Sequence, residues 1–141
     1  MSATRTSATL EGVWKPIGAW LSGRELDLAE LRVAQLEFDT TNYRIIDRAG
    51  DIVDHGRYRL DRAVSPSSLD FVGEVGVNAD RTLEAVIDLC VDAEGQDQLT
   101  MCYDVDGGPR PESVLPPGER PEGEALLLTL CFERVVRRTF S

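Results

Sequence analysis

The chain has one histidine, one lysine and three cysteines among its 141 residues, and each scarcity excludes a class of site. A single histidine, His55, rules out catalytic or metal-binding arrangements that need two, and we expect it on the surface. Cys90, Cys102 and Cys131 form no Cys-x-x-Cys pair, which disfavours a zinc site and a disulfide framework and predicts buried free thiols. We therefore expect neither a metal nor a cofactor.

Long apolar runs and an excess of positive charge are also missing. No run approaches the roughly 18 apolar residues of a membrane span, and the first twelve residues lack the apolar core of a secretory signal. The net charge of −10 disfavours nucleic acid and anionic lipid as partners. We expect a cytoplasmic protein with one domain over residues 10–136, a disordered lead-in over 1–9 and a tail over 137–141.

Apolar and polar residues alternate along most of the chain, which is the pattern of strands with one buried face. In residues 82–91 the alternation is regular, apart from Val86 on the outer face. In residues 51–61 we expect Ile52, Gly56, Tyr58 and Leu60 to face inward. The expected strands are residues 11–21, 35–39, 43–47, 51–61, 67–73, 82–91, 97–105 and 124–136.

The connections between these runs indicate the fold class. Most are too short for parallel crossovers, so we expect antiparallel neighbours and an all-β fold. About eight such strands predict an antiparallel up-and-down barrel with room for one small ligand, and a two-sheet sandwich is the alternative. Residues 27–34 predict one short helix after the first strand, with Asp27 as its cap and Glu30 in the capping-box position. Residues 104–124 hold five of the seven prolines and predict a long irregular loop.

Short collinear motifs between residues 10 and 135 resemble a group of bacterial lipocalin-like domains of uncharacterised function. The matching pieces are Leu10-Glu11-Gly12-Val13-Trp14-Lys15, Ser22-Gly23, Leu36-Glu37-Phe38, Tyr43-Arg44-Ile45, Gly56-Arg57-Tyr58-Arg59-Leu60-Asp61, Leu99-Thr100-Met101-Cys102 and Arg110-Pro111-Glu112-Ser113. The resemblance implies a calycin-type barrel and no particular activity. It also implies structural roles for Gly12 and Trp14, with Arg134 packing on the indole at the closed end.

The acidic residues near strand ends do not have the spacing of a calcium loop. We interpret this group as solvated turn residues: Asp47, Asp51, Asp54, Asp104 and Asp106. Trp20 has the strand phase of Trp14, although Pro16 and Gly18 predict a bulge or bend between them. We therefore expect Trp20 near the mouth of the barrel. The ligand-binding candidates that share the inward phase are Trp20, Phe38, Tyr43, Tyr58, Met101, Tyr103, Leu128 and Leu130.

Three functions are compatible with this pattern. The first is a barrel that binds a small, mostly apolar organic molecule, oriented by the tyrosine hydroxyls. The second is a cofactor-independent cyclase or isomerase, in which the cavity folds a substrate into a reactive conformation. The third is an interaction protein or homodimer that uses the proline-rich loop or an outer face containing Val53, Val86 and Leu127.

Overall fold

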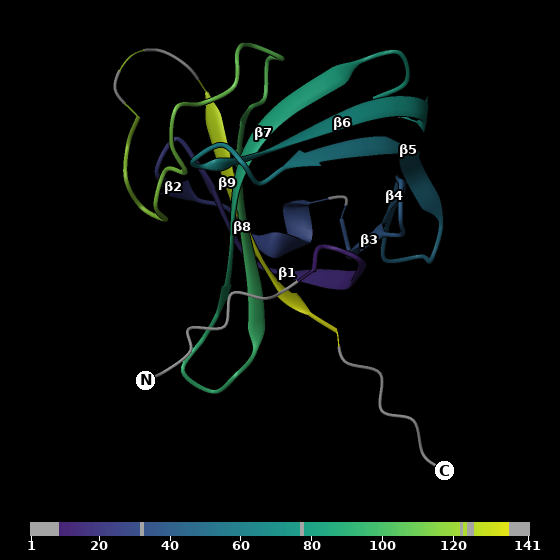
Figure 1. The fold of residues 1–141 in the computed structure, drawn as a ribbon, viewed down its shortest axis with the longest axis horizontal. Helices are drawn as coiled ribbons and strands as arrows, with labels where there is room; N and C mark the ends of the chain where they lie inside the picture. Colours follow the sequence, from purple (N-terminus) through teal and green to yellow (C-terminus); the bar gives the residue numbers. More distant parts are fainter. Residues whose placement is uncertain (1–8, 32, 77, 122, 124–125, 136–141) are drawn as a thin grey trace.

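A computed structural model describes residues 9–31, 33–76, 78–121, 123 and 126–135, and shows a closed antiparallel up-and-down β-barrel (Figure 1). Each barrel strand pairs with its successor, and β9 pairs with β1 to close the ring. The barrel strands are β1 (Gly12–Leu21), β3 (Gln35–Phe38), β4 (Asn42–Ile46), β5 (Ile52–Asp61), β6 (Ser67–Gly76), β7 (Thr82–Val91), β8 (Asp97–Asp104) and β9 (Leu127–Arg134). The two-residue β2 (Arg24–Glu25) pairs with β1 outside the ring. The predicted all-β barrel is confirmed. The predicted lead-in over residues 1–9 and tail over 137–141 lie outside the described residues, apart from Thr9.

Aspartate side chains stabilise several of the tight turns. The Asp39 carboxylate accepts hydrogen bonds from the backbone of Thr41 and Asn42, at 3.0 and 2.7 Å. Asp47 and Asp92 accept equivalent bonds in the β4–β5 and β7–β8 turns. An aspartate that bonds its own backbone in this way favours a turn over a continuing strand, which keeps the strand connections short.

The barrel interior is filled mainly by the apolar residues that alternate along the strands. The buried side chains of this core are Leu10, Trp14, Ala19, Leu36, Phe38, Tyr43, Leu69, Phe71, Ala85, Ile87, Leu99, Met101, Leu128, Leu130 and Phe132. The predicted period of two is therefore confirmed for β3, β7, β8 and β9. Pairing of β9 with β1 closes the ring, so each barrel strand has a hydrogen-bonded neighbour on both sides.

The short helix after the first strand is a single 3-10 turn, Leu28–Glu30. Asp27 caps it as predicted, because its carboxylate accepts a hydrogen bond of 2.9 Å from the Ala29 amide. The turn ends where Leu31 adopts an extended backbone, so the helix is shorter than the predicted residues 27–34. Apolar residues of this segment, including Leu28 and Val33, pack against the core at the end of the barrel remote from Trp14.

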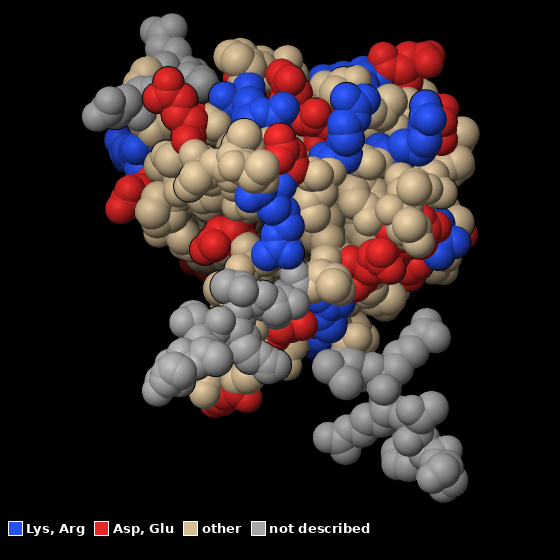
Figure 2. Space-filling view, in the orientation of Figure 1, with Lys and Arg blue, Asp and Glu red and all other residues tan. Residues whose placement is uncertain are grey.

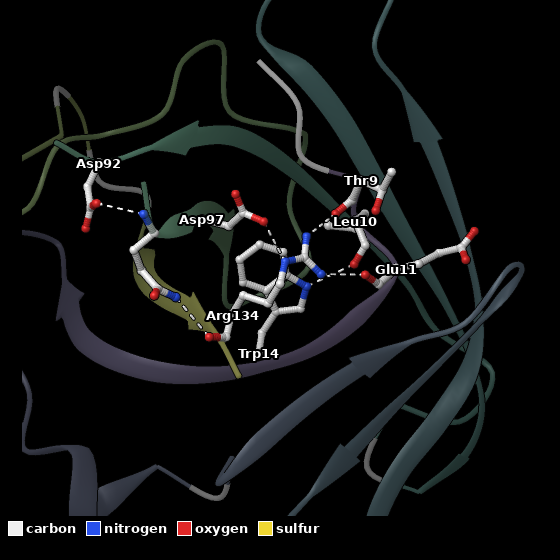
Figure 3. Close-up of polar contacts among 8 residues, drawn as sticks. Thr9, Leu10, Glu11, Trp14, Asp92, Asp97 and Arg134 are labelled. Carbon is white, nitrogen blue, oxygen red and sulfur yellow. Dashed lines mark hydrogen bonds and ion pairs between the residues drawn. The ribbon is translucent and has the colours of Figure 1, made fainter. Parts of the chain in front are cut away.

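Trp14 and Arg134 close the other end of the barrel (Figure 3). Trp14 is fully buried, and its indole nitrogen donates a hydrogen bond of 2.9 Å to the Leu10 carbonyl. The guanidinium carbon of Arg134 lies 4.4 Å from the centre of the Trp14 ring. Its Nε donates to Asp97 Oδ2 at 2.7 Å, and its two terminal nitrogens donate to the carbonyls of Glu11 and Thr9. The planar fork of one arginine thereby connects β9, β8 and the segment before β1.

Gly12 lets the chain pass close to this arginine. Its φ of +129° lies in a region that favours glycine. A Cβ atom at this position would lie 2.5 Å from Arg134 Nη1. Glycine is therefore required here for two reasons, one conformational and one steric.

The long connection between β8 and β9 covers part of the outer surface of the barrel, beside β2 and β9 in Figure 1. Under it, Val86, Cys102 and Thr129 face outward in one row across three strands, yet none is more than 1% exposed. Thr129 Oγ1 donates a hydrogen bond of 3.0 Å to the carbonyl of Leu115 in this connection. The chain itself covers Val86, which was a predicted member of an exposed outer face, while Val53 and Leu127 are half-buried.

Arg110 fastens the same connection to the barrel wall. Its guanidinium donates to the Ala85 carbonyl at 2.9 Å and lies 2.6 Å from an Asp70 carboxylate oxygen.

The three cysteines differ in exposure: Cys102 is buried and Cys131 is half-buried. Cys90, however, is exposed on the outer face of β7, so the prediction of three buried thiols is wrong for this residue.

The surface is strongly charged and of mixed sign. Figure 2 shows basic and acidic side chains intermixed over one face of the molecule. Salt bridges such as Lys15 with Glu133 and Arg57 with Glu74 join neighbouring strands. Within the described residues, no helix has the length and apolar character needed to cross a membrane.

Candidate functional site

A small cavity lies inside the barrel, towards the end that the 3-10 segment covers. Its volume is about 60 Å³. The lining is mostly apolar and aromatic, with two residues, Val33 and Asn78, from connecting segments rather than strands. The full lining is Val33, Leu36, Tyr43, Ile45, Asp54, Phe71, Asn78, Leu83, Met101, Tyr103, Leu130 and Phe132.

Asp54 on β5 is the one acidic residue among the described residues of this lining. Its side chain is 1% exposed. Oδ2 accepts hydrogen bonds from the Tyr43 hydroxyl at 3.2 Å and from Asn78 Nδ2 at 2.8 Å. Oδ1 is buried and has no hydrogen-bond partner among the described residues. A buried polar atom without a partner is costly, by about 1–3 kcal/mol and more for a charged group, so Oδ1 marks a site that a ligand atom could complete.

The interpretation of Asp54 as a solvated turn residue was therefore wrong. Asp54 has the same strand phase as Gly56, Tyr58 and Leu60, and this phase was the available signal that it faces inward. The charge of the side chain favoured an exposed position in the prediction, because an ionisable side chain is rarely buried without a partner. Ile52, predicted to face inward, is 52% exposed.

Two β-bulges place Asp54 and explain the outward position of Ile52. On one side, Asp54 pairs with Ile45 while Ile52 pairs with Ile46, so Val53 is the extra residue of β5. On the other side, the pairing of β5 with β6 shifts at Glu74. A bulge changes the direction of the following side chains and is common beside functional sites. Here, bulges against both neighbouring strands lie within two residues of one buried carboxylate.

Gly73 positions the side-chain amide of Asn78, which donates to Asp54. The β6–β7 connection returns sharply here: the Gly73 amide donates to the Arg81 carbonyl at 2.9 Å, and Asp80 donates to the Gly73 carbonyl at 3.0 Å. A Cβ atom on Gly73 would overlap the backbone carbonyl of Asn78. Only glycine lets the connection approach β6 closely enough for Asn78 to reach Asp54.

The two tyrosines of the cavity are held in the neutral form. Burial, followed by the negative charge of Asp54, raises the pKa of Tyr103 to about 12. The same two causes, together with the hydrogen bond to Asp54, raise the pKa of Tyr43 further. Burial also raises the pKa of Tyr58. At neutral pH, the phenol groups beside Asp54 therefore retain their protons.

These shifts predict a loss of stability in alkaline solution. A phenol in the unfolded chain ionises near pH 10, whereas Tyr103 keeps its proton to about pH 12 in the fold. The stabilisation linked to a raised pKa is complete below the unfolded pKa and is lost as pH rises through the folded one. We expect the free energy of unfolding to fall between about pH 10 and 12. Absorbance at 295 nm should show little tyrosinate in the native protein at pH 10, and ionisation of half the phenols there would contradict the assignment.

The structure separates the predicted ligand-binding residues into three groups: residues that line the cavity, residues inside the barrel but outside the lining, and Trp20 on the outer face. Tyr43, Met101, Tyr103 and Leu130 line the cavity. Phe38, Tyr58 and Leu128 lie in the barrel without lining it. The Tyr58 hydroxyl points to the closed end, where it donates to the Asp39 carbonyl at 2.6 Å, and its ring packs edge-on against Phe38 at 4.9 Å between centroids.

Trp20 lies on the outer face of the barrel, contrary to the prediction. Its partner in β9 is the outward-facing Thr129, whereas its neighbour Ala19 pairs with the inward Leu130. The cause is a bulge at Ile17, which shifts the strand phase between Pro16 and Gly18. Beyond it, the Trp20 indole folds back over Gly18, where a Cβ atom would collide with the ring. Pro16 and Gly18 predict the bulge, and because it adds one residue to β1, it reverses the phase of Trp20 relative to Trp14.

Within the described residues, no three histidine, cysteine, aspartate or glutamate side chains are grouped as metal ligands would be. Comparison with protein-family models, curated proteins and solved structures finds no match to this chain. The interior cavity is the candidate site, because it contains the buried Asp54 Oδ1 without a partner among the described residues.

Proposed function

We propose that the barrel binds a small, mostly apolar organic molecule in its interior, with the polar end of that molecule at Asp54. The observation that carries this proposal is the buried Oδ1 without a hydrogen-bond partner in an otherwise apolar cavity. The closed barrel and the motifs that resemble lipocalin-like domains support it. Burial of the apolar part would provide affinity, and Asp54 with the two tyrosines would orient the ligand.

The cavity volume limits the size of the ligand. About 60 Å³ is far below the roughly 300–1,000 Å³ of pockets that enclose drug-sized molecules. An engineered cavity of about 150 Å³ binds benzene, so this one has room for about two or three non-hydrogen atoms. We infer that it takes a very small molecule, or the head of a longer one whose remainder passes Val33 and Asn78. The alternative function predicted from the sequence, a cofactor-independent cyclase or isomerase, stays a prediction.

Leu83→Phe is expected to abolish ligand binding by filling the cavity that Leu83 lines. Leu89→Phe is the matched control, because Leu89 lies on the same strand and the same inner face but outside the lining. A mixture of molecules with up to about six non-hydrogen atoms would be screened by saturation-transfer NMR. Signals from bound molecules should appear with the native protein and with Leu89→Phe, and should vanish with Leu83→Phe. An absence of bound molecules in the native protein would contradict the proposal.

A further inference from the structure

We propose that the polar end of the ligand is a protonated amine, so that the barrel is a receptor for small organic ammonium ions. This inference rests on the proposed function and specifies the ligand class of the same cavity. It depends on three features of the lining: the bonding of Asp54, the lack of a cationic side chain among the described residues, and the aromatic walls.

The bonding pattern identifies Asp54 as an acceptor. Oδ2 receives hydrogen bonds from two donors, the Tyr43 hydroxyl and the Asn78 amide. Both donors are neutral, so neither supplies a counter-charge to this carboxylate, which is only 1% exposed. Oδ1 is the oxygen left to accept a further donor.

Among the described residues, the lining contains no lysine, arginine or histidine to neutralise this charge. Buried charges in proteins are normally paired, because an isolated ion in an apolar environment is strongly disfavoured. Two other carboxylates of the barrel wall, those of Asp70 and Asp97, pair with Arg110 and Arg134. Among the described residues of the cavity lining, no cation pairs with Asp54, so we infer that a ligand brings the positive charge.

The walls of the cavity suit an organic cation rather than a metal ion. Phe71 meets the Tyr43 ring edge-on at 4.9 Å between centroids, and Tyr103 and Phe132 also line the space. Aromatic faces attract an ammonium group, and this attraction increases when the group is desolvated. The apolar residues would contact the carbon chain of an amine, whereas a metal ion would need several more oxygen ligands than the lining provides.

Met101 offers a direct readout, because this residue lines the cavity and the chain has only one other methionine, Met1. Protein labelled with ¹³C at the methionine methyl groups would be titrated at neutral pH with n-propylamine, n-propanol and propionate. These probes have four or five non-hydrogen atoms and differ in their polar end. The end of each carbon chain would extend past Val33 and Asn78. Met101→Leu assigns the signal, and the Met1 signal serves as the internal control.

We expect n-propylamine to shift the Met101 signal at a concentration at least tenfold lower than n-propanol, and propionate to have no effect. In Asp54→Asn, amine and alcohol should bind with similar affinity, because the charge that distinguishes them is gone. Thermal unfolding would verify that this variant folds. The comparison of the three probes on the native protein tests the ammonium inference without the variant. Equal or stronger binding of n-propanol would overturn the ammonium inference and leave the proposed function intact. If none of the three probes shifts the Met101 signal, both proposals fail.

Discussion

Replacing Trp14 by alanine is expected to lower the free energy of unfolding by about 3–5 kcal/mol, the cost of truncating a fully buried tryptophan. The indole fills the closed end of the barrel and donates to the Leu10 carbonyl. Its removal would leave a cavity and would also deprive the Arg134 guanidinium of the ring on which it packs. Urea denaturation followed by circular dichroism would measure the loss, because the unfolding midpoint should move while the slope stays constant.

Trp20→Ala is the control for the same residue type on the same strand. Trp20 is only partly buried and packs over Gly18 on the outside of the barrel, so its truncation should cost about 1–2 kcal/mol. Intrinsic fluorescence of the two variants also separates the indoles, since each retains one tryptophan. Equal losses of stability would contradict the assignment of Trp14 to the core and Trp20 to the outer face.

The fold was predictable because the information for it is local and repeated. Alternation along the strands, short turns and the absence of long helical patterns each predict antiparallel pairing, and a ring of eight strands satisfies all of them. Errors arose where the period of two is interrupted. The bulges at Ile17 and Val53 reverse the phase of Trp20 and Ile52, and only the ladder registers reveal on which side of Pro16 or Asp54 the extra residue falls.

The candidate site was only partly predictable. Tyr43, Met101, Tyr103 and Leu130 could be identified because inward phase and apolar character coincide in them. Asp54 could not be identified in that way. Charged residues are normally expected on the surface, and a buried functional carboxylate is an exception to this expectation. Asn78 depends on how closely the β6–β7 connection returns to Gly73, which is a long-range property that no local pattern encodes.

Arg134 should be the other large contributor to stability, through its geometry rather than its charge alone. Arg134→Ala would remove the partner of Asp97, the donors to the carbonyls of Glu11 and Thr9, and the cover over Trp14. We expect a loss of about 2–4 kcal/mol, the combined size of charged hydrogen bonds and a cation–π contact.

A comparison of two substitutions would distinguish the guanidinium fork from a simple positive charge at this end of the barrel. Arg134→Lys keeps the charge, but an ammonium cannot bond Asp97 and two carbonyls in one plane while it stacks on the indole, so most of the loss should remain. Lys15→Ala is the matched control: Lys15 pairs with Glu133 on the adjacent rung of the same two strands, at 54% side-chain exposure. Such an exposed pair should contribute no more than about 0.5–1 kcal/mol. Full stability of Arg134→Lys in urea denaturation would mean that charge alone closes the barrel.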